Sequence, residues 1–263
     1  MIKCSILVTG DEILNCSVKD ENYYFLCSEL NSLGYFCNEV VFVRDSIDEI
    51  VFYLRKFLNN VDLVIITGGL GPTWDDITLD SISKAFKIPL SLNNEALNLI
   101  KKRYEYLSKN MEINKWREKM AYLPLGSIPI KNDVGTAPGI ILKLEKTIFI
   151  ALPGVPKEMK NMFVNHVKNE LIETFGKFTY LEKNFILNGT DESTISPLLE
   201  HLRYKFPEIY IKSRAGLSEN FNKILINVVI REKDIETCKK NFDVFLKYFK
   251  KELEKINISM EMI

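Results

Sequence analysis

Several widespread functional signatures are missing from this 263-residue sequence. Neither G-x-x-x-x-G-K-[ST] nor G-x-G-x-x-G occurs at its glycine-rich turns, which excludes a P-loop and a Rossmann dinucleotide site there. The two histidines, His166 and His201, fall on predicted helices, and a Ser/His/Asp triad has no support. No apolar stretch approaches the length of a membrane-spanning helix, so we expect no membrane partner.

Net charge and paired-cysteine motifs are also absent. The 35 Lys and Arg residues balance 35 Asp and Glu residues, so no overall field draws the protein to nucleic acid, and any anion site must be local. Because the pattern predicts a strand directly after Met1, we expect no signal peptide and no export. The cysteine number is odd and no C-x-x-C occurs, which indicates reduced core thiols in a cytoplasmic protein; the cysteines are Cys4, Cys16, Cys27, Cys37 and Cys238.

The stretch from Asp62 to Thr78 carries the strongest pattern that is present. Leu63 to Ile66 is a continuous apolar run, as expected of a central strand buried on both faces of a parallel sheet. A loop with three glycines follows, and small residues let backbone N–H groups approach an anion closely. Adjacent carboxylates at Asp75 and Asp76 are hard oxygen ligands for a divalent cation. The coincidence favours a phosphate site over a tight turn with an N-capping aspartate.

The preceding residues predict a β-α-β-α-β order. Strands at 4–8 and 35–43 alternate with helices at 22–33 and 47–58, before the strand at Asp62. The carboxyl ends of these parallel strands should meet at one edge, with Asp11, Asp45 and Asp76 at their tips. We expect further helices at 75–86 and 94–107. A single aspartate at a strand end is usually a cap or turn residue, but three on one edge suggest a ligand crevice.

Two more loops are candidates for walls of this crevice. Gly135 to Gly139 precedes a hairpin of strands at 140–144 and 147–152, and Leu152 to Lys157 follows it. Pro156 then starts a helix to about Thr174, whose first N–H groups can face an anion. On the residues alone, plain proline-glycine loops are an equally good interpretation.

The remaining sequence predicts a second, smaller α+β domain. Strands at 184–187, 209–212 and 223–231 and helices at 191–204 and 234–254 give a β-α-β-β-α order. This order resembles K-homology domains, but their G-x-x-G clamp is missing at Gly189–Glu192, so we expect no nucleic-acid binding. We place the domains at residues 1–174 and 178–263, and expect the second to serve assembly or to cover the site through Lys212–Arg214 and Gly216.

The motifs named above resemble those of the competence/damage-inducible protein CinA amino-terminal family. The matching segments run in the family's order from Thr9–Leu14 through Gly-Gly-Leu-Gly-Pro-Thr-Trp-Asp-Asp-Ile-Thr to Leu152–Met159. The resemblance implies a three-layer α/β/α molybdopterin-binding-like domain, a K-homology-like second domain and a homodimer. Two features depart from the family. Its full-length members carry a carboxyl-terminal amidase domain for which this chain has no room, so we expect no amidase activity, and Cys16 stands where the family usually has Gly.

The resemblance further implies metal-dependent hydrolysis of ADP-ribose to AMP and ribose 5-phosphate, with potassium and Mg²⁺, Mn²⁺, Co²⁺ or Ni²⁺. Our hypothesis is that Asp45 and Asp76 are catalytic and that Asp75 and Asp76 hold the metal. The substrate-binding candidates are Thr9, Gly10, Asp11, Glu12, Asn22, Thr67, Gly68, Gly69, Gly71, Pro72, Thr73, Gly135, Thr136, Ala137, Pro138, Gly154 and Lys157. FAD hydrolysis, a molybdopterin-binding step of molybdenum-cofactor biosynthesis and a non-catalytic nucleotide-binding module are the alternatives. The sequence does not choose among these substrates or metals.

Overall fold

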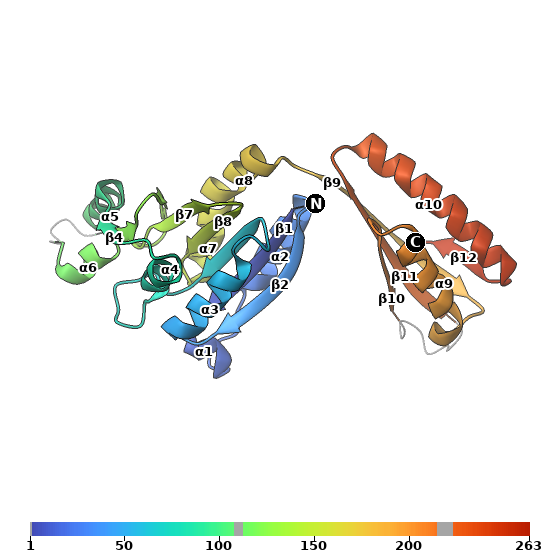
Figure 1. Ribbon diagram of the computed structural model, residues 1–263, viewed down its shortest axis with the longest axis horizontal. Helices are drawn as coiled ribbons and strands as arrows, with labels where there is room; N and C mark the ends of the chain where they lie inside the picture. The colour runs from blue at the N-terminus through green and yellow to red at the C-terminus, as the bar shows by residue number, and fades with distance from the viewer. Residues whose placement is uncertain (1, 108–112, 215–222) are drawn as a thin grey trace. The chain divides into compact units, whose positions relative to one another are not determined.

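The computed structural model describes residues 2–107, 113–214 and 223–263. Its internal contacts divide the chain into two compact units. The first contains Met1–Asn31 and Tyr35–Gly176, and the second contains Ser32–Gly34 and Lys177–Ile263. Both units are mixtures of helices and strands (Figure 1). Each unit is described by itself below.

A six-stranded sheet in the order β2-β1-β3-β8-β7-β6 organises the first unit. Strand β3 is entirely buried at the centre and runs parallel to β1 and β8, while β1 also runs parallel to β2. Strands β7 and β6 are antiparallel additions. The carboxyl ends of β1, β2, β3 and β8 therefore lie at one edge. The strands are β1 Lys3–Thr9, β2 Phe36–Val43, β3 Leu63–Thr67, β6 Ile128–Ile130, β7 Gly139–Leu144 and β8 Thr147–Leu152.

Helices cover both faces of this sheet, giving the predicted three-layer α/β/α arrangement (Figure 1). On one face, Ile50 and Leu54 of α3 and Ile82 of α4 pack with Leu7 and Val64 in one apolar cluster. On the other face, α2 and η1 meet where the rings of Phe25 and Phe163 make an edge-to-face contact. The helices are α2 Asn22–Ser32, α3 Ile47–Phe57, α4 Thr78–Phe86, α5 Asn94–Leu107, α7 Pro156–Met162, η1 Phe163–Val167 (a π-helical turn) and α8 Lys168–Phe175. Shorter elements are α1 Asp11–Leu14, α6 Lys115–Lys119 and the two-stranded sheet of β4 Leu90–Leu92 with β5 Tyr122–Pro124.

The prediction that a helix begins at Asp75 is wrong, because α4 begins at Thr78. The Asp76 carboxylate accepts a hydrogen bond from the Thr73 N–H, so it closes a turn behind itself instead of capping a helix ahead. Thr78 fixes the actual start, since its hydroxyl donates to Gly68 O and its N–H donates to Gly69 O. The chain between β3 and α4 is therefore an irregular loop with both aspartates in it.

The second unit has a four-stranded antiparallel sheet in the order β10-β11-β9-β12. Phe185 of β9 packs with Phe245 and Phe249 in its core. The sequence did not predict β12, whose Ser-Met-Glu-Met sequence has no β-branched residue to indicate a strand. The elements are β9 Thr179–Asn188, α9 Glu192–Lys205, β10 Tyr210–Arg214, β11 Lys223–Glu232, α10 Ile235–Lys255 and β12 Ser259–Met262. Lys212–Arg214 belong to β10, and Gly216 lies outside the described residues.

No helix in the described part of the chain has the length and apolar character needed to cross a membrane. The likeness of the second unit to K-homology domains stays a prediction.

Candidate functional site

A cleft of about 510 Å³ opens at the carboxyl edge of the first unit's sheet. Loops after β1, β3 and β8 and the start of α2 form its walls. The predicted residues on these walls are Thr9, Gly10, Glu12, Asn22, Asp45, Thr67, Gly68, Gly69, Gly71, Pro72, Asp75, Asp76, Thr136, Ala137 and Gly154. Other predicted residues do not line this cleft; they are Asp11, Thr73, Gly135, Pro138 and Lys157. The strand-end loops that the sequence predicted to meet therefore do meet at the carboxyl edge of the sheet.

The glycine loop after β3 presents backbone donors to this cleft. Gly68 and Gly69 have positive φ angles of 105° and 66°, which turn the chain sharply at the strand end. Among the described residues, no acceptor is bonded to the N–H groups of Gly69, Leu70 and Gly71. The Gly68 N–H, in contrast, donates to Leu152 O at 3.0 Å. The prediction that Gly68 binds phosphate through its N–H is therefore wrong, because this group continues the pairing between β3 and β8.

Close backbone packing explains why the strand ends need small residues. A Cβ atom on Gly68 would lie 2.6 Å from both the carbonyl oxygen and the hydroxyl of Thr9. A Cβ on Gly154 would lie 3.3 Å from Gly68 Cα. Side chains at these positions would force the three loops apart. Gly154 itself is exposed at the cleft.

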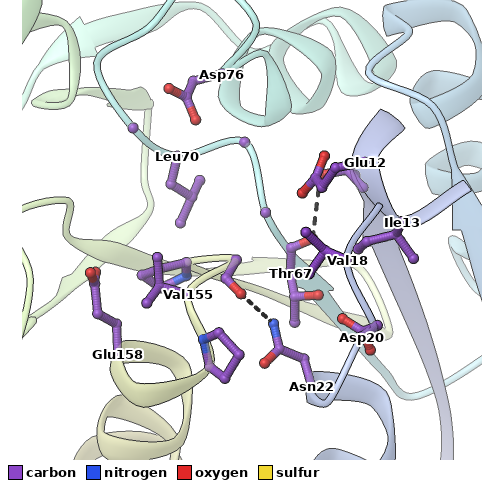
Figure 2. A pocket seen from close by; sticks show the side chains of 18 of the residues that line it. Glu12, Ile13, Val18, Asp20, Asn22, Thr67, Leu70, Asp76, Val155 and Glu158 are labelled. Atoms are coloured by element: carbon purple, nitrogen blue, oxygen red, sulfur yellow. Dashed lines mark hydrogen bonds between the residues drawn. The ribbon is translucent and has the colours of Figure 1, made fainter. Parts of the chain in front are cut away.

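Two buried polar atoms on the cleft wall have no hydrogen-bond partner among the described residues. They are the Thr67 hydroxyl and the Asn22 Oδ1, in residues that are each 1% exposed. Asn22 is oriented by its own amide, since Nδ2 donates to Gly154 O at 2.7 Å (Figure 2). Unpartnered buried polar atoms are uncommon because each costs free energy. A ligand in the cleft would supply the missing partners.

Asp45 lies in a region of negative potential at the same edge. Burial raises the pKa of its carboxyl group above the usual value, and the nearby carboxylates of Glu12, Asp11 and Asp75 raise it further. The Asp11 N–H opposes this shift, because it donates to Asp45 Oδ2 at 3.1 Å. Asp11 thus contributes its backbone, while its side chain lies 3.7 Å from the Arg44 guanidinium. The negative potential favours a cation or a proton at Asp45.

Thr73 positions the paired aspartates instead of lining the cleft. Its N–H donates to Asp76 Oδ2 at 2.8 Å, and its hydroxyl can donate to Asp76 or to Asp75. On the outer side of the loop, Lys119 Nζ donates to the carbonyl oxygens of Thr73 and Asp76 at 2.5 and 2.8 Å. These contacts hold the two carboxylates at the end of the glycine loop.

Sequence reasoning missed Glu158, which lines the cleft from the first turn of α7. Its Oε2 accepts from Asn132 Nδ2 at 2.7 Å, and Asn132 Oδ1 accepts from the Gly135 N–H. A Cβ on Gly135 would lie 1.9 Å from that Oε2, so Gly135 makes room for the carboxylate and not for a ligand. Lys157, the preceding helix residue, is exposed.

Apolar lining residues were also missed. Ile13, Val18, Leu70 and Val155 contribute to the wall, and Figure 2 shows them among the carboxylates of Glu12, Asp76 and Glu158. The only available signal was their position directly after the predicted strand-end turns. The cleft thus has backbone N–H donors that could bind a phosphate on one loop, hydrogen-bond acceptors on the other loops, and apolar side chains between them.

A helix-covered, mostly parallel sheet with a cleft at its carboxyl edge places the first unit among the open α/β domains, in which ligands bind at this edge. A family model described as a probable molybdopterin binding domain matches residues 5–173. The chain belongs to this family. This match covers the whole of the cleft.

Individual relatives extend the similarity. A protein of Sulfurisphaera tokodaii is 41% identical over 221 residues, covering 84% of this chain and 82% of the relative. A protein of Pyrococcus abyssi is 35% identical over 245 residues, covering 91% and 94%. The crystal structure of the protein CinA with unknown function from Thermoplasma acidophilum is 37% identical, with a TM-score of 0.59, and covers 64% of this chain and 98% of that one. The resemblance to the CinA amino-terminal family is confirmed.

Proposed function

We propose that the cleft binds a phosphorylated pterin of the molybdopterin class. The observation that carries the proposal is the pair of buried, unpartnered polar atoms on the cleft wall, Thr67 Oγ1 and Asn22 Oδ1. The description of the matching family as a probable molybdopterin binding domain supports this ligand class. This description favours the pterin alternative over ADP-ribose, so pterin binding becomes the leading proposal.

The phosphate group would lie on the glycine loop. The N–H groups of Gly69, Leu70 and Gly71 are the donors that the described chain leaves without acceptors. The Thr67 hydroxyl stands at the base of the same loop and can donate to a phosphate oxygen. Successive backbone N–H groups in a turn form a concave site that suits an anion.

The pterin ring would lie among the acceptors and apolar residues. A 2-aminopyrimidinone edge offers N–H donors, and Asn22 Oδ1 is a buried acceptor without a partner. Glu158 Oε1 is a second acceptor on the cleft, since Asn132 engages Oε2. Ile13, Val18 and Val155 provide the apolar surface that a flat ring requires.

A divalent cation fits this site only together with a phosphate. Within the parts of the chain that are described, no cluster of three or more His, Cys, Asp or Glu side chains is arranged to hold a metal ion. Mg²⁺ is usually held by one or two carboxylates together with the phosphates of its ligand. In this cleft Asp45, Asp75 and Asp76 could provide the carboxylates. When bound, such a cation would neutralise phosphate charge. Binding of potassium and assembly into a homodimer, which the family resemblance implies, also remain proposals.

Hydrolysis of a nucleotide diphosphate bridge, as in ADP-ribose or FAD, is the second candidate. The raised pKa of Asp45 favours it, because a carboxylate with a raised pKa is a better general base for water. The phosphate loop and Asp45 line the same cleft, so a bound diphosphate could be attacked there. ADP-ribose would yield AMP and ribose 5-phosphate.

The test compares ligands on one preparation of the full chain. Binding of molybdopterin is measured anaerobically by ultrafiltration, and ADP-ribose and FAD are incubated with Mg²⁺, Mn²⁺, Co²⁺ or Ni²⁺ and analysed for AMP by chromatography. Saturable molybdopterin binding that Asn22→Leu weakens would support the main proposal. Failure of molybdopterin to bind would contradict it, whatever the other ligands do.

The second candidate has its own readout. AMP release that disappears in both Asp45→Asn and Asp76→Asn would establish hydrolysis. Asp48→Asn is the matched control, because Asp48 is an exposed aspartate on α3 that pairs with Lys84 away from the cleft. Absence of AMP with every metal would remove this candidate and leave pterin binding standing.

A further inference from the structure

Two cysteines of the first unit lie side by side although they are ten residues apart in sequence. Cys27 on α2 and Cys37 on β2 have their sulfur atoms 3.5 Å apart, and both residues are partly exposed. The expectation that the cysteines lie in the core holds for Cys4 and Cys238, but Cys16 is exposed. No spacing motif marks the pair, because it forms only when α2 packs against β2.

The two thiols are chemically different. In the neutral pair the Cys27 thiol donates to Cys37 Sγ at 3.5 Å. Once Cys27 is ionised, the Cys37 thiol can donate to the thiolate instead, so the hydrogen bond between the two lowers the pKa of Cys27, with burial acting against it, and raises the pKa of Cys37. Among the described residues, the Cys4 thiol on β1 also lies beside the pair, opposite Cys37 in the sheet, and Asp62 lies near Cys4. Burial raises the pKa of Cys4 strongly, so it stays protonated and uncharged. The lowered pKa favours Cys27 over Cys37 as the attacking thiol.

We propose that Cys27 and Cys37 form a thiol–disulfide exchange site that accepts low-molecular-weight disulfides. The Cys27 thiolate attacks one sulfur of the oxidant, whose S–S bond breaks and releases a thiolate with the bonding electron pair. Cys37 then gives up its proton and attacks the Cys27 sulfur, which expels the second thiol. Two protein thiols are oxidised, and one disulfide is reduced to two thiols.

The local structure can accommodate the bond. The sulfur atoms must approach by about 1.5 Å to reach a normal S–S distance. Strand β2 is at the edge of the sheet, and the register passes from Cys4 opposite Cys37 to Ser5 opposite Glu39, so Asn38 is an extra residue. Ladder pairing is already interrupted at such a bulge, so a small shift breaks few hydrogen bonds.

The experiment incubates the full chain with oxidised glutathione and identifies the products by intact mass and peptide mapping. All proteins carry Cys16→Ser, which removes the exposed thiol. We expect a Cys27–Cys37 disulfide in this background and a stable glutathione adduct on Cys27 when Cys37→Ser is added. Cys27→Ser should slow the reaction at least several-fold. An adduct that persists on Cys27 while Cys37 is present would overturn the proposal.

A pH series separates an activated thiolate from simple proximity. The rate of Cys27 alkylation by iodoacetamide should rise at a lower pH than for an ordinary cysteine. Cys37→Ser keeps a hydroxyl donor, whereas Cys37→Ala removes it, so the alanine variant should react several-fold more slowly near neutral pH. Equal rates in these two variants would contradict the assigned hydrogen bond. Peptide mapping of the Cys16→Ser protein needs no variant at the pair, so it remains decisive if a variant misfolds.

Discussion

Asn22 of the first unit and Asn227 of the second unit are both buried, but the hydrogen-bonding groups of their side chains are satisfied differently. Asn227 on β11 of the second unit is 7% exposed, and its amide donates to Glu182 Oε1 and Asn184 Oδ1 at 2.5 and 2.9 Å. Asn22 at the start of α2 is 1% exposed, and its Oδ1 has no partner among the described residues. Asn227 therefore completes a structural hydrogen-bond network, whereas Asn22 leaves an acceptor for a ligand.

Sheet topology explains where this difference arises. In the first unit, parallel strands bring four carboxyl ends to one edge, so their loops meet and polar groups gather. In the second unit, antiparallel strands send successive ends to opposite edges, so its loops are divided between them. A binding cleft therefore follows from the connection of the strands more than from residue composition.

The largest effect is expected from Gly69→Ala. The φ of 66° strains any residue with a side chain, and the added Cβ would lie 2.4 Å from the Thr78 hydroxyl. We expect at least a hundredfold loss of ligand affinity, about 3 kcal/mol, because the donor loop must move. Calorimetric titration measures the affinity.

Gly126→Ala is the matched control for that change. Gly126 also has a positive φ of 87°, but nothing lies within 4 Å of its added Cβ. It should cost about 1–2 kcal/mol of stability from backbone strain alone and leave the affinity unchanged. Equal affinity losses in the two variants would show that the glycine loop has no specific role.

The second prediction exchanges the two asparagines for leucine. Asn22→Leu should weaken ligand binding about tenfold, because it removes a buried acceptor. The loss of stability should be small, because Gly154 is exposed and water can replace the amide donor that its carbonyl oxygen loses. Asn227→Leu should lower stability by about 1–3 kcal/mol, since Glu182 and Asn184 lose their donor, and should not change affinity. Titration calorimetry and thermal unfolding measure both. The reverse pattern would contradict the functional assignment of Asn22.

The smallest effect is expected from Asp45→Asn without ligand. Folding raises the pKa of Asp45, so the folded state binds its proton more tightly than the unfolded state does. The associated stability is complete below the unfolded pKa of about 3.9 and is lost as pH rises through the raised value. At pH 7 the variant should therefore melt about 1 °C higher than the parent. This gain should vanish near pH 3.

Asp48→Asn should give the opposite sign. Lys84 lowers the pKa of Asp48, so its stabilising contribution is present above the unfolded pKa and disappears as pH falls through the lowered value. The variant should melt slightly lower than the parent at pH 7. If both variants shift the melting temperature in the same direction, the negative potential assigned to Asp45 is wrong.

Most of the first unit could be predicted from the sequence because its strands and turns are locally encoded. The apolar run of β3 and the glycines after it define both a central strand and its loop. The role of Gly68 could not be predicted, because the acceptor of its N–H is Leu152 O, which is in place only because β8 pairs with β3. Glu158 was missed for a similar reason, since Asn132, 26 residues earlier, sets its orientation.

The remaining differences between the predicted and the observed structure arise from side-chain contacts that local sequence patterns do not record. A helix was predicted to begin at Asp75, but the Asp76 carboxylate accepts a hydrogen bond from the Thr73 N–H, and α4 begins only at Thr78. The contact between Cys27 and Cys37 depends on the packing of a helix against an edge strand, which no local pattern records. Local sequence therefore predicts elements and turns, whereas tertiary packing decides which polar groups remain available.

The most direct test of the central claim is a backbone amide NMR titration with molybdopterin under anaerobic conditions. The account predicts that the amide signals of Gly69, Leu70 and Gly71 shift saturably, while that of Gly68, bonded to Leu152, shifts least within the loop. Saturable binding that leaves the Gly69–Gly71 amides unchanged would contradict the proposed phosphate site.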